Sequence, residues 1–144
     1  MKLLVLNGPN LNLLGSRETD IYGTGSLADL ENGLRNEFPD VDFAFVQGNH
    51  EGSLIDTLHG ASGDGVDGVV FNPAGYSHTS VALRDAVAAI DIPVVEVHIS
   101  NVYARERFRH VSRTAAAAIG VITGLGMTGY SLAVRYLSIH ASRS

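Results

Sequence analysis

The sequence of 144 residues contains no cysteine. This absence excludes disulfides, thiolate nucleophiles and cysteine-ligated metals, and it favours a cytoplasmic protein. No apolar stretch approaches the ~20 residues that a membrane helix needs, and the N-terminus lacks a basic segment followed by a long apolar one. We therefore expect neither a membrane span nor a signal peptide.

Lysine is also scarce, because Lys2 is the only one, and the formal net charge is -5. An acidic chain is a poor candidate for general nucleic-acid binding, which calls for a basic face. The arginines are unevenly distributed, however, and four of them lie between Arg105 and Arg113. Because arginine binds carboxylates and phosphates through a planar fork, this cluster predicts a small anionic ligand.

Apolar and amphipathic segments alternate along the whole chain. Five short apolar runs are typical of buried strands: Lys2–Leu6, Val41–Val46, Val66–Phe71, Ile92–Val97 and Gly120–Thr123. Helical patterns are predicted from Ser26, from Asn49, over His78–Ile90 and over Met127–His140. Parallel strands joined by right-handed crossovers form a doubly wound α/β sheet, for which five strands favour the flavodoxin-like order 2-1-3-4-5. We predict one such domain over residues 1–144.

Polar residues follow the first four predicted strands at the point where each strand ends. In folds of this class the ligand lies beyond the carboxyl ends of the strands, near the switch in strand order. Five of these side chains are therefore expected to converge on one crevice: Asn10, Asn72, His78, His98 and Ser100. Each has an ordinary structural interpretation as well, because asparagine is common in turns and His78 also fits the first turn of a helix. No metal-binding motif occurs among them.

Glu96 and His98 are two residues apart in a predicted strand, so their side chains point to the same face. A glutamate beside a histidine fixes the tautomer of the ring and favours the imidazolium, which is a general acid able to protonate a leaving hydroxyl. The alternative is that Glu96 is a strand-end residue with a solvated carboxylate.

Arg105, Arg109 and Arg113 are spaced four residues apart and would share one face of a helix. A solvated basic face is one interpretation of this spacing. The other is that at least one of the three binds an anion or a hydroxyl group, since the segment comes directly after the fourth strand.

A long loop, about residues 15–25, separates the first strand from the first helix. Loops of this length are uncommon unless they are functional or disordered. The loop carries Arg17 and Tyr22, and glycines at both ends provide hinges. A tyrosine hydroxyl is a poor base at neutral pH, but a neighbouring guanidinium favours the phenolate. The loop is therefore predicted to be a lid that brings a tyrosine base over the crevice; the alternative is a mobile surface loop.

Three long motifs resemble type II 3-dehydroquinate dehydratase, and together they span almost the whole chain. They are LNGPNLNLLGSRETDIYG (6–23), NPAGYSHTSVALRDA (72–86) and VEVHISNVYARERFRHVS (95–112), and the C-terminal ITGLGMTGYSLAVRYL is similar too. The resemblance implies a flavodoxin-like fold and the reversible anti dehydration of 3-dehydroquinate to 3-dehydroshikimate in the shikimate pathway. It implies neither a metal nor an organic cofactor.

The resemblance also implies roles for individual residues. Tyr22 would abstract the C2 proton, assisted by Arg17 and Arg105, while Asn10 would hold a water against the enolate oxygen. His98, supported by Glu96, would protonate the departing C1 hydroxyl. The substrate would be bound through its carboxylate by Ile99 and Ser100, and through its hydroxyls by Asn72, His78 and Arg109. Asp85 would reach the site of a neighbouring subunit, since members of the family form dodecamers built from trimers. Arg107 and Arg113 are left without a role.

The chain departs from the family pattern at four positions: Thr19, Gly48, Pro73 and Tyr76. Thr19 stands where a proline commonly follows the arginine–glutamate pair, which predicts a more mobile lid. Gly48 replaces a usual serine. None of the four removes a residue with a chemical role.

Two other functions compete with this one. A flavodoxin-like module could bind a nucleotide or FMN, although neither GxGxxG nor GxxxxGK[ST] occurs. A serine hydrolase could use Ser77 or Ser100 with a histidine, although the G-x-S-x-G elbow is missing.

Overall fold

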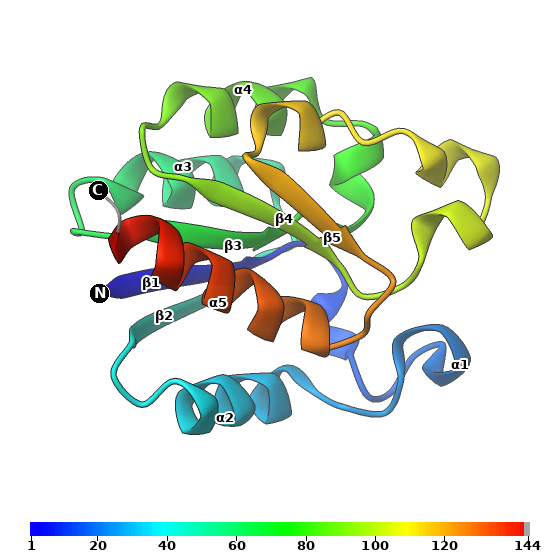
Figure 1. The fold of residues 1–144 in the computed structure, drawn as a ribbon. Helices are drawn as coiled ribbons and strands as arrows, with labels where there is room; N and C mark the ends of the chain where they lie inside the picture. Colours follow the sequence, from blue (N-terminus) through cyan, green and yellow to red (C-terminus); the bar gives the residue numbers. More distant parts are fainter. Residues whose placement is uncertain (143–144) are drawn as a thin grey trace.

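The structure is a computed structural model that describes residues 1–142. Its five strands form one parallel sheet in the order β2-β1-β3-β4-β5, which confirms the predicted flavodoxin-like topology (Figure 1). The strands are β1 (Lys2–Asn7), β2 (Asp42–Gln47), β3 (Gly68–Asn72), β4 (Val94–His98) and β5 (Gly120–Thr123).

Helices cover both faces of the sheet. The four longer ones are α2 (Leu27–Glu37), α3 (Glu51–Ala61), α4 (Val81–Ala89) and α5 (Thr128–Ser142). The shorter ones are α1 (Thr19–Tyr22) and five 3₁₀ turns: η1 (Leu11–Leu13), η2 (Ala74–His78), η3 (Val102–Ala104), η4 (Arg107–His110) and η5 (Ala115–Ala117). None of the helices within residues 1–142 is long and apolar enough to span a membrane.

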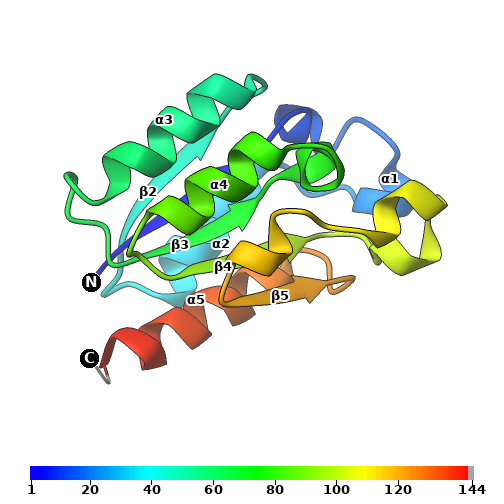
Figure 2. The same cartoon turned by 90° about the horizontal axis from the view of Figure 1, so that it is seen from above.

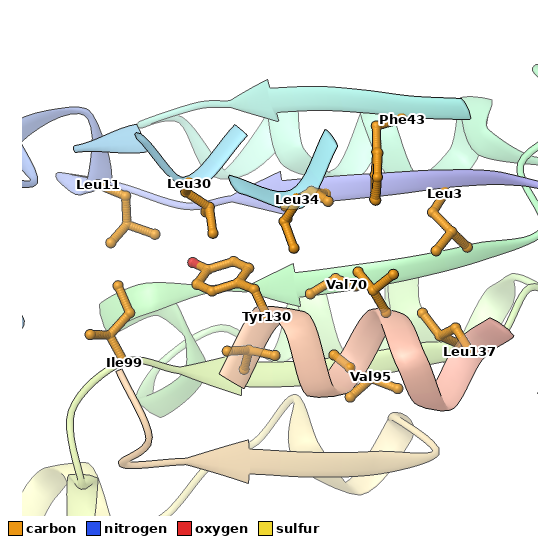
Figure 3. Close-up of a cluster of buried hydrophobic side chains, with 14 of the residues drawn as sticks. Leu3, Leu11, Leu30, Leu34, Phe43, Val70, Val95, Ile99, Tyr130 and Leu137 are labelled. Carbon is orange, nitrogen blue, oxygen red and sulfur yellow. The ribbon is translucent and has the colours of Figure 1, made fainter. Parts of the chain in front are cut away.

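The alternation of side chains along each strand divides the core into two clusters, one on each face of the sheet. On one face, residues such as Leu3, Val70 and Val95 pack against α2 and α5 (Figure 3). On the other face, residues such as Leu4 and Phe71 pack against α3 and α4. Since β1, β3 and β4 are buried on both faces, their apolar residues do not alternate with exposed polar ones.

The helix starts confirm one expectation and correct two. Ser26 forms a capping box with Asp29 at the start of α2. The helix predicted from Asn49 begins later, because His50 is the cap residue of α3 and the Asn49 side chain is hydrogen-bonded elsewhere. The helix expected over residues 78–90 is split into η2 and α4, since Ser80 Oγ accepts the N–H of Leu83 and begins a new helix.

The loops that follow the strands gather at one end of the sheet. Both views place α1 beside the segment that runs from η3 to η4 at this end (Figures 1 and 2). The long loop after β1 and the basic segment after β4 are therefore neighbours in space. Their proximity provides the walls of the site described next.

Candidate active site

A cavity of about 110 Å³ lies beyond the carboxyl ends of β1, β3 and β4. Eleven of the twelve predicted site residues are close to it, and ten line it directly: Asn10, Arg17, Tyr22, Asn72, His78, His98, Ile99, Ser100, Arg105 and Arg109. Glu96 lies behind His98, and Asp85 is elsewhere on the molecule. The convergence expected from the strand order is thus present in the fold.

Tyr22 enters the cavity from α1 and lies between two guanidinium groups. The guanidinium carbons of Arg17 and Arg105 are 4.9 Å and 5.2 Å from the centre of its ring. Only Arg105 reaches the hydroxyl, to which its Nη1 donates a hydrogen bond of 2.8 Å. Arg17 instead pairs with Glu18, its Nη2 donating to Oε2 at 2.8 Å. Both cations lie within the range of cation–π attraction, so they hold the ring in place.

The basic segment after β4 is not the continuous helix that the arginine spacing suggested. Its two 3₁₀ turns are separated by Arg105 and Glu106, whose backbones are extended, so the three arginines do not share a helix face. Arg105 and Arg109 line the cavity. Arg113 faces away from it and donates from Nε to the carbonyl oxygen of His78 at 3.3 Å.

His98 and Glu96 are adjacent at the end of β4, as their spacing predicted. Nε2 of His98 lies 3.2 Å from Oε2 of Glu96, within ion-pair distance for a protonated ring but without the alignment of a hydrogen bond. The opposite ring nitrogen, Nδ1, makes no hydrogen bond within residues 1–142. The side chain is only 7% exposed and borders the main cavity.

The Glu96 carboxylate is not solvated, because its side chain is only 1% exposed. Burial by itself would raise the pKa of this carboxyl. The His98 ring and the hydroxyls of Thr114 and Ser112 outweigh that effect and hold the pKa of Glu96 below its usual range. Glu96 is therefore a buried carboxylate, which is the state that supports a protonated imidazole.

His78 comes from η2 and stacks at 6.2 Å against His98. Its Nδ1 lies 2.8 Å from the carbonyl oxygen of Val111 and must carry the proton, because a carbonyl only accepts. Burial lowers the pKa of His78, and the nearby His98 and Arg109 lower it further, against an opposing contribution from the Val111 carbonyl. His78 is thus a neutral ring whose other nitrogen is an acceptor.

Asn72 lines the cavity, and its side chain is fixed by hydrogen bonds to neighbouring residues. Its Nδ2 donates to the hydroxyl of Tyr130 at 2.8 Å, and that hydroxyl donates to Oδ1 of Asn7 at 2.6 Å. Its Oδ1 accepts the N–H of Ala74 at 3.0 Å. Tyr130 belongs to α5 and is fully buried, and its burial raises the pKa of the phenol well above the ordinary value. One amide hydrogen of Asn72 remains for a ligand.

Asn10 adopts the left-handed backbone region, with φ of 69°. Asparagine is one of the few residues that tolerate this conformation. The backbone N–H of Asn10 donates to Oδ1 of Asn49 at 3.0 Å, and Oδ1 of Asn49 also accepts from Gln47. The exposed side chain of Asn10 is left free to point into the cavity.

The turn after β4 presents the backbone of Ile99 and Ser100 to the cavity. Neither N–H donates to another residue in the part of the chain that the structure describes. The carbonyl oxygens are taken, since Ile99 accepts from Gly126 and Ser100 accepts from Thr123. Two free N–H donors beside the Arg105 guanidinium form a site suited to an anion such as a carboxylate.

Comparison with known proteins identifies the family. The family model for dehydroquinase class II matches residues 1–138. The chain belongs to the class II dehydroquinase family.

Relatives of high similarity share both sequence and fold. The 3-dehydroquinate dehydratase of Exiguobacterium sp. is 58% identical over 141 residues, which cover 97% of this chain and 96% of the relative. The corresponding protein of Bacillus licheniformis is 58% identical over 136 residues, covering 93% of each chain. The crystal structure of the type II dehydroquinase from Butyrivibrio crossotus superposes with a TM-score of 0.94 at 45% identity, covering 96% of this chain and 97% of that one.

Asp85 is the one predicted site residue of this class II dehydroquinase chain that lies away from the cavity. It lies on α4 with a side chain that is 66% exposed and pairs with Arg84 at 3.3 Å. It makes no contribution to the cavity of its own chain.

Three of the four departures from the family pattern lie in identifiable local settings. Thr19 is the first residue of α1, a position where proline is favoured because the missing N–H costs nothing. A Cβ on Gly48 would meet Oγ of Ser53 at 2.9 Å, so glycine fits this turn without moving that serine. The hydroxyl of Tyr76 donates to the carbonyl oxygen of Asn49 at 3.0 Å and ties η2 to the loop after β2.

The geometry disfavours the serine-hydrolase alternative. Ser77 is fully buried, and its Oγ lies 3.4 Å from both ring nitrogens of His78. Ser100 accepts a hydrogen bond of 3.1 Å from Arg105 and has no histidine partner. Within residues 1–142 there is also no cluster of three metal-ligating side chains.

Three residues around the dehydroquinase site were not predicted from the sequence: Ser112, Thr114 and Tyr130. Tyr130 could have been found from the sequence, because it places a hydroxyl group in the apolar stripe of the last helix, and a buried tyrosine hydroxyl usually has a hydrogen-bond partner. No sequence feature distinguishes Ser112 and Thr114, since serine and threonine are common beside turns.

Proposed function

We propose that this chain catalyses the reversible anti dehydration of 3-dehydroquinate to 3-dehydroshikimate, a step of the shikimate pathway that leads to aromatic amino acids. The observation that carries the proposal is the meeting of Tyr22 and His98 in one cavity, each with a charged partner. Elimination of water needs a base and an acid at two separate positions of the substrate, and these two side chains supply them. Family membership supports the same reaction.

Tyr22 is the proposed base, which removes a proton from C2 beside the ketone. The negative charge passes to the ketone oxygen as an enolate, and the phenolate that initiates the step is stabilised by the hydrogen bond from Arg105. Arg17, over the ring face, adds a second positive charge. Asn10 is proposed to hold a water against the enolate oxygen, since its side chain is free at the mouth of the cavity.

His98 is the proposed acid, which delivers a proton to the departing C1 hydroxyl so that water leaves. The buried carboxylate of Glu96 stabilises the imidazolium needed for this step. The reaction balances, because Tyr22 gains the proton from C2 while His98 gives its own proton to the departing water. One proton must then pass from Tyr22 back to His98, directly or through solvent, before the next turnover.

Substrate binding is assigned to the remaining residues of the cavity. The N–H groups of Ile99 and Ser100 are proposed to bind the carboxylate, and Asn72, His78 and Arg109 the ring hydroxyls. The proposed chemistry requires no metal and no organic cofactor. We also propose a cytoplasmic homo-oligomer, a dodecamer built from trimers, in which Asp85 reaches a neighbouring site; light scattering measures the assembly.

An absorbance assay tests the reaction. Dehydroshikimate absorbs in the ultraviolet where dehydroquinate does not, so purified protein and dehydroquinate should produce a rising signal. A flat trace with folded wild-type protein would rule out the proposed function. A thermal shift with FMN or nucleotides in that case would favour the binding-module alternative.

A further inference from the structure

Two hydroxyl groups enclose the carboxylate of Glu96 from the segment between η4 and η5. Thr114 donates from Oγ1 to Oε1 of Glu96. Ser112 donates from Oγ to Oε2 at 2.8 Å. Thr114 is 1% exposed, so water does not replace its hydroxyl in the folded protein.

The two bonds fix the rotation of the carboxylate. The terminal torsion of a glutamate is otherwise broad, because it joins a tetrahedral carbon to a planar group. With one hydroxyl on each oxygen, Oε2 is held in the position that lies 3.2 Å from Nε2 of His98. The hydroxyls therefore determine which oxygen meets the ring and where.

The hydroxyl donors are themselves anchored. Oγ of Ser112 accepts the backbone N–H of Ala115 at 3.1 Å, which fixes the serine in the turn that leads to β5. Thr114 is the cap residue of η5. The cradle around the carboxylate is thus built into the main chain at the edge of the sheet.

We infer that Ser112 and Thr114 are positioning residues for the dehydration, because their hydroxyls hold the ionised Glu96 carboxylate in place for His98. The inference rests on the proposed function, since it acts through the proton that His98 delivers. Neither hydroxyl lines the main cavity, so neither touches the substrate.

The charged surroundings of this pair define the expected pH dependence. Besides His98, the titratable groups nearby are His78 from η2, and Arg109 and His110 from η4, which border the same small space of about 80 Å³. The hydroxyls offset the effect of burial, which by itself raises the pKa of Glu96. Removal of one hydroxyl is therefore expected to raise that pKa. Glu96 then becomes protonated at a higher pH during acidification. His98 loses the carboxylate that stabilises its protonated ring at that same, higher pH.

Thr114→Val, Thr114→Ser and Thr57→Val test the inference. Valine keeps the volume of Thr114 and removes its donor, whereas serine keeps the donor and removes a methyl group. Thr57 lies half-buried on α3, where its hydroxyl donates to the carbonyl oxygen of Ser53 at 2.8 Å, and its replacement provides the same chemical change away from the site. In T114V we expect kcat to fall about 10-fold, KM to stay constant and the acidic limb of kcat/KM to move to higher pH. T114S and T57V should keep the wild-type limb.

The inference is overturned if all three variants share the wild-type pH profile, or if T114S shifts the acidic limb as far as T114V does. Should T114V not fold, Ser112→Ala removes the other donor from a half-buried position and is expected to shift the limb in the same direction. The ¹³C resonance of the Glu96 carboxyl gives a readout without substrate, and its titration midpoint should rise in T114V alone. A wild-type protein that folds but does not turn over dehydroquinate refutes the proposed function; the carboxyl titration still decides whether the hydroxyls hold Glu96.

Discussion

Arg105 donates a hydrogen bond of 2.8 Å to the hydroxyl of Tyr22 across 83 residues of sequence. The same Nη1 also donates to Ser100 at 3.1 Å, so one guanidinium joins the lid to the turn after β4. The Arg105 side chain is only 11% exposed, which strengthens these contacts relative to a pair in water. The lid is therefore attached to the site through the proposed base itself.

Replacement of Arg105 should impair catalysis more than substrate binding. Arg105→Met removes the donor to Tyr22, and the loss of a hydrogen bond to a charged group corresponds to a drop of about 10- to 100-fold in kcat. Arg107→Met is the matched control, because Arg107 is exposed and does not line the cavity. Equal kcat in the two variants, measured by the absorbance assay, would contradict the role of Arg105.

Removal of the Tyr22 hydroxyl should nearly abolish turnover. Tyr22→Phe keeps the ring between Arg17 and Arg105 but eliminates the base, whose contribution is typically 10²- to 10⁴-fold. We expect kcat to fall about 10³-fold while the dissociation constant of the substrate changes little. Calorimetry measures the binding and the absorbance assay measures kcat; substantial retained turnover would assign the base elsewhere.

Topology and the main site residues could be predicted from the sequence because local patterns determine them. Apolar runs locate the strands, and strand order brings their polar ends together. At their carboxyl ends the first four strands extend one residue beyond the apolar runs, to Asn7, Gln47, Asn72 and His98, whereas β2, β3 and β4 begin one or two residues later than predicted. Backbone ladder bonds do not require an apolar side chain, so polar strand ends stay in the sheet.

The supporting contacts could not be predicted, since they join residues far apart in the chain. Tyr130 reaches Asn7 across 123 residues, and the hydroxyls on Glu96 come from a turn that carries no sequence signature. The prediction from the arginine spacing was wrong for a related reason. It assumed one continuous helix, whereas the segment forms two 3₁₀ turns joined by residues with extended backbone. Such features depend on tertiary packing, which overrides local propensity.

Tyr130 should be important for stability as well as for the floor of the site. Tyr130→Phe leaves the Asn7 oxygen and an Asn72 hydrogen buried without their partner, at a cost of about 1–3 kcal/mol in the free energy of unfolding. Tyr136→Phe makes the same change at an exposed position of α5 and should stay within about 0.5 kcal/mol of wild type. Urea denaturation compares the two; equal stabilities would mean that the buried hydroxyl contributes nothing.

His78 should make the protein less stable on mild acidification. Its pKa is lower in the folded protein than in the unfolded chain, so the unfolded chain binds more protons as pH falls below about 6.5. The contribution of His78 is therefore present above this pH and is lost as pH falls towards the native pKa. His78→Gln should flatten the decline of Tm between pH 7 and 5.5, whereas His59→Gln, at an exposed position of α3, should not. A slope unchanged by His78→Gln would contradict this origin.

Asp85 should contribute to catalysis only between subunits. On its own chain the side chain is exposed on α4 and away from the cavity, so a direct effect on turnover requires a neighbouring copy. Asp85→Ala is expected to raise KM, and Asp56→Ala, another exposed aspartate on α3, is the matched control. Coexpression of Asp85→Ala with the inactive His98→Asn variant should restore activity, because hybrid assemblies pair an intact His98 with an intact Asp85. Activity no greater than that of the separately purified variants would show that Asp85 serves no neighbouring site.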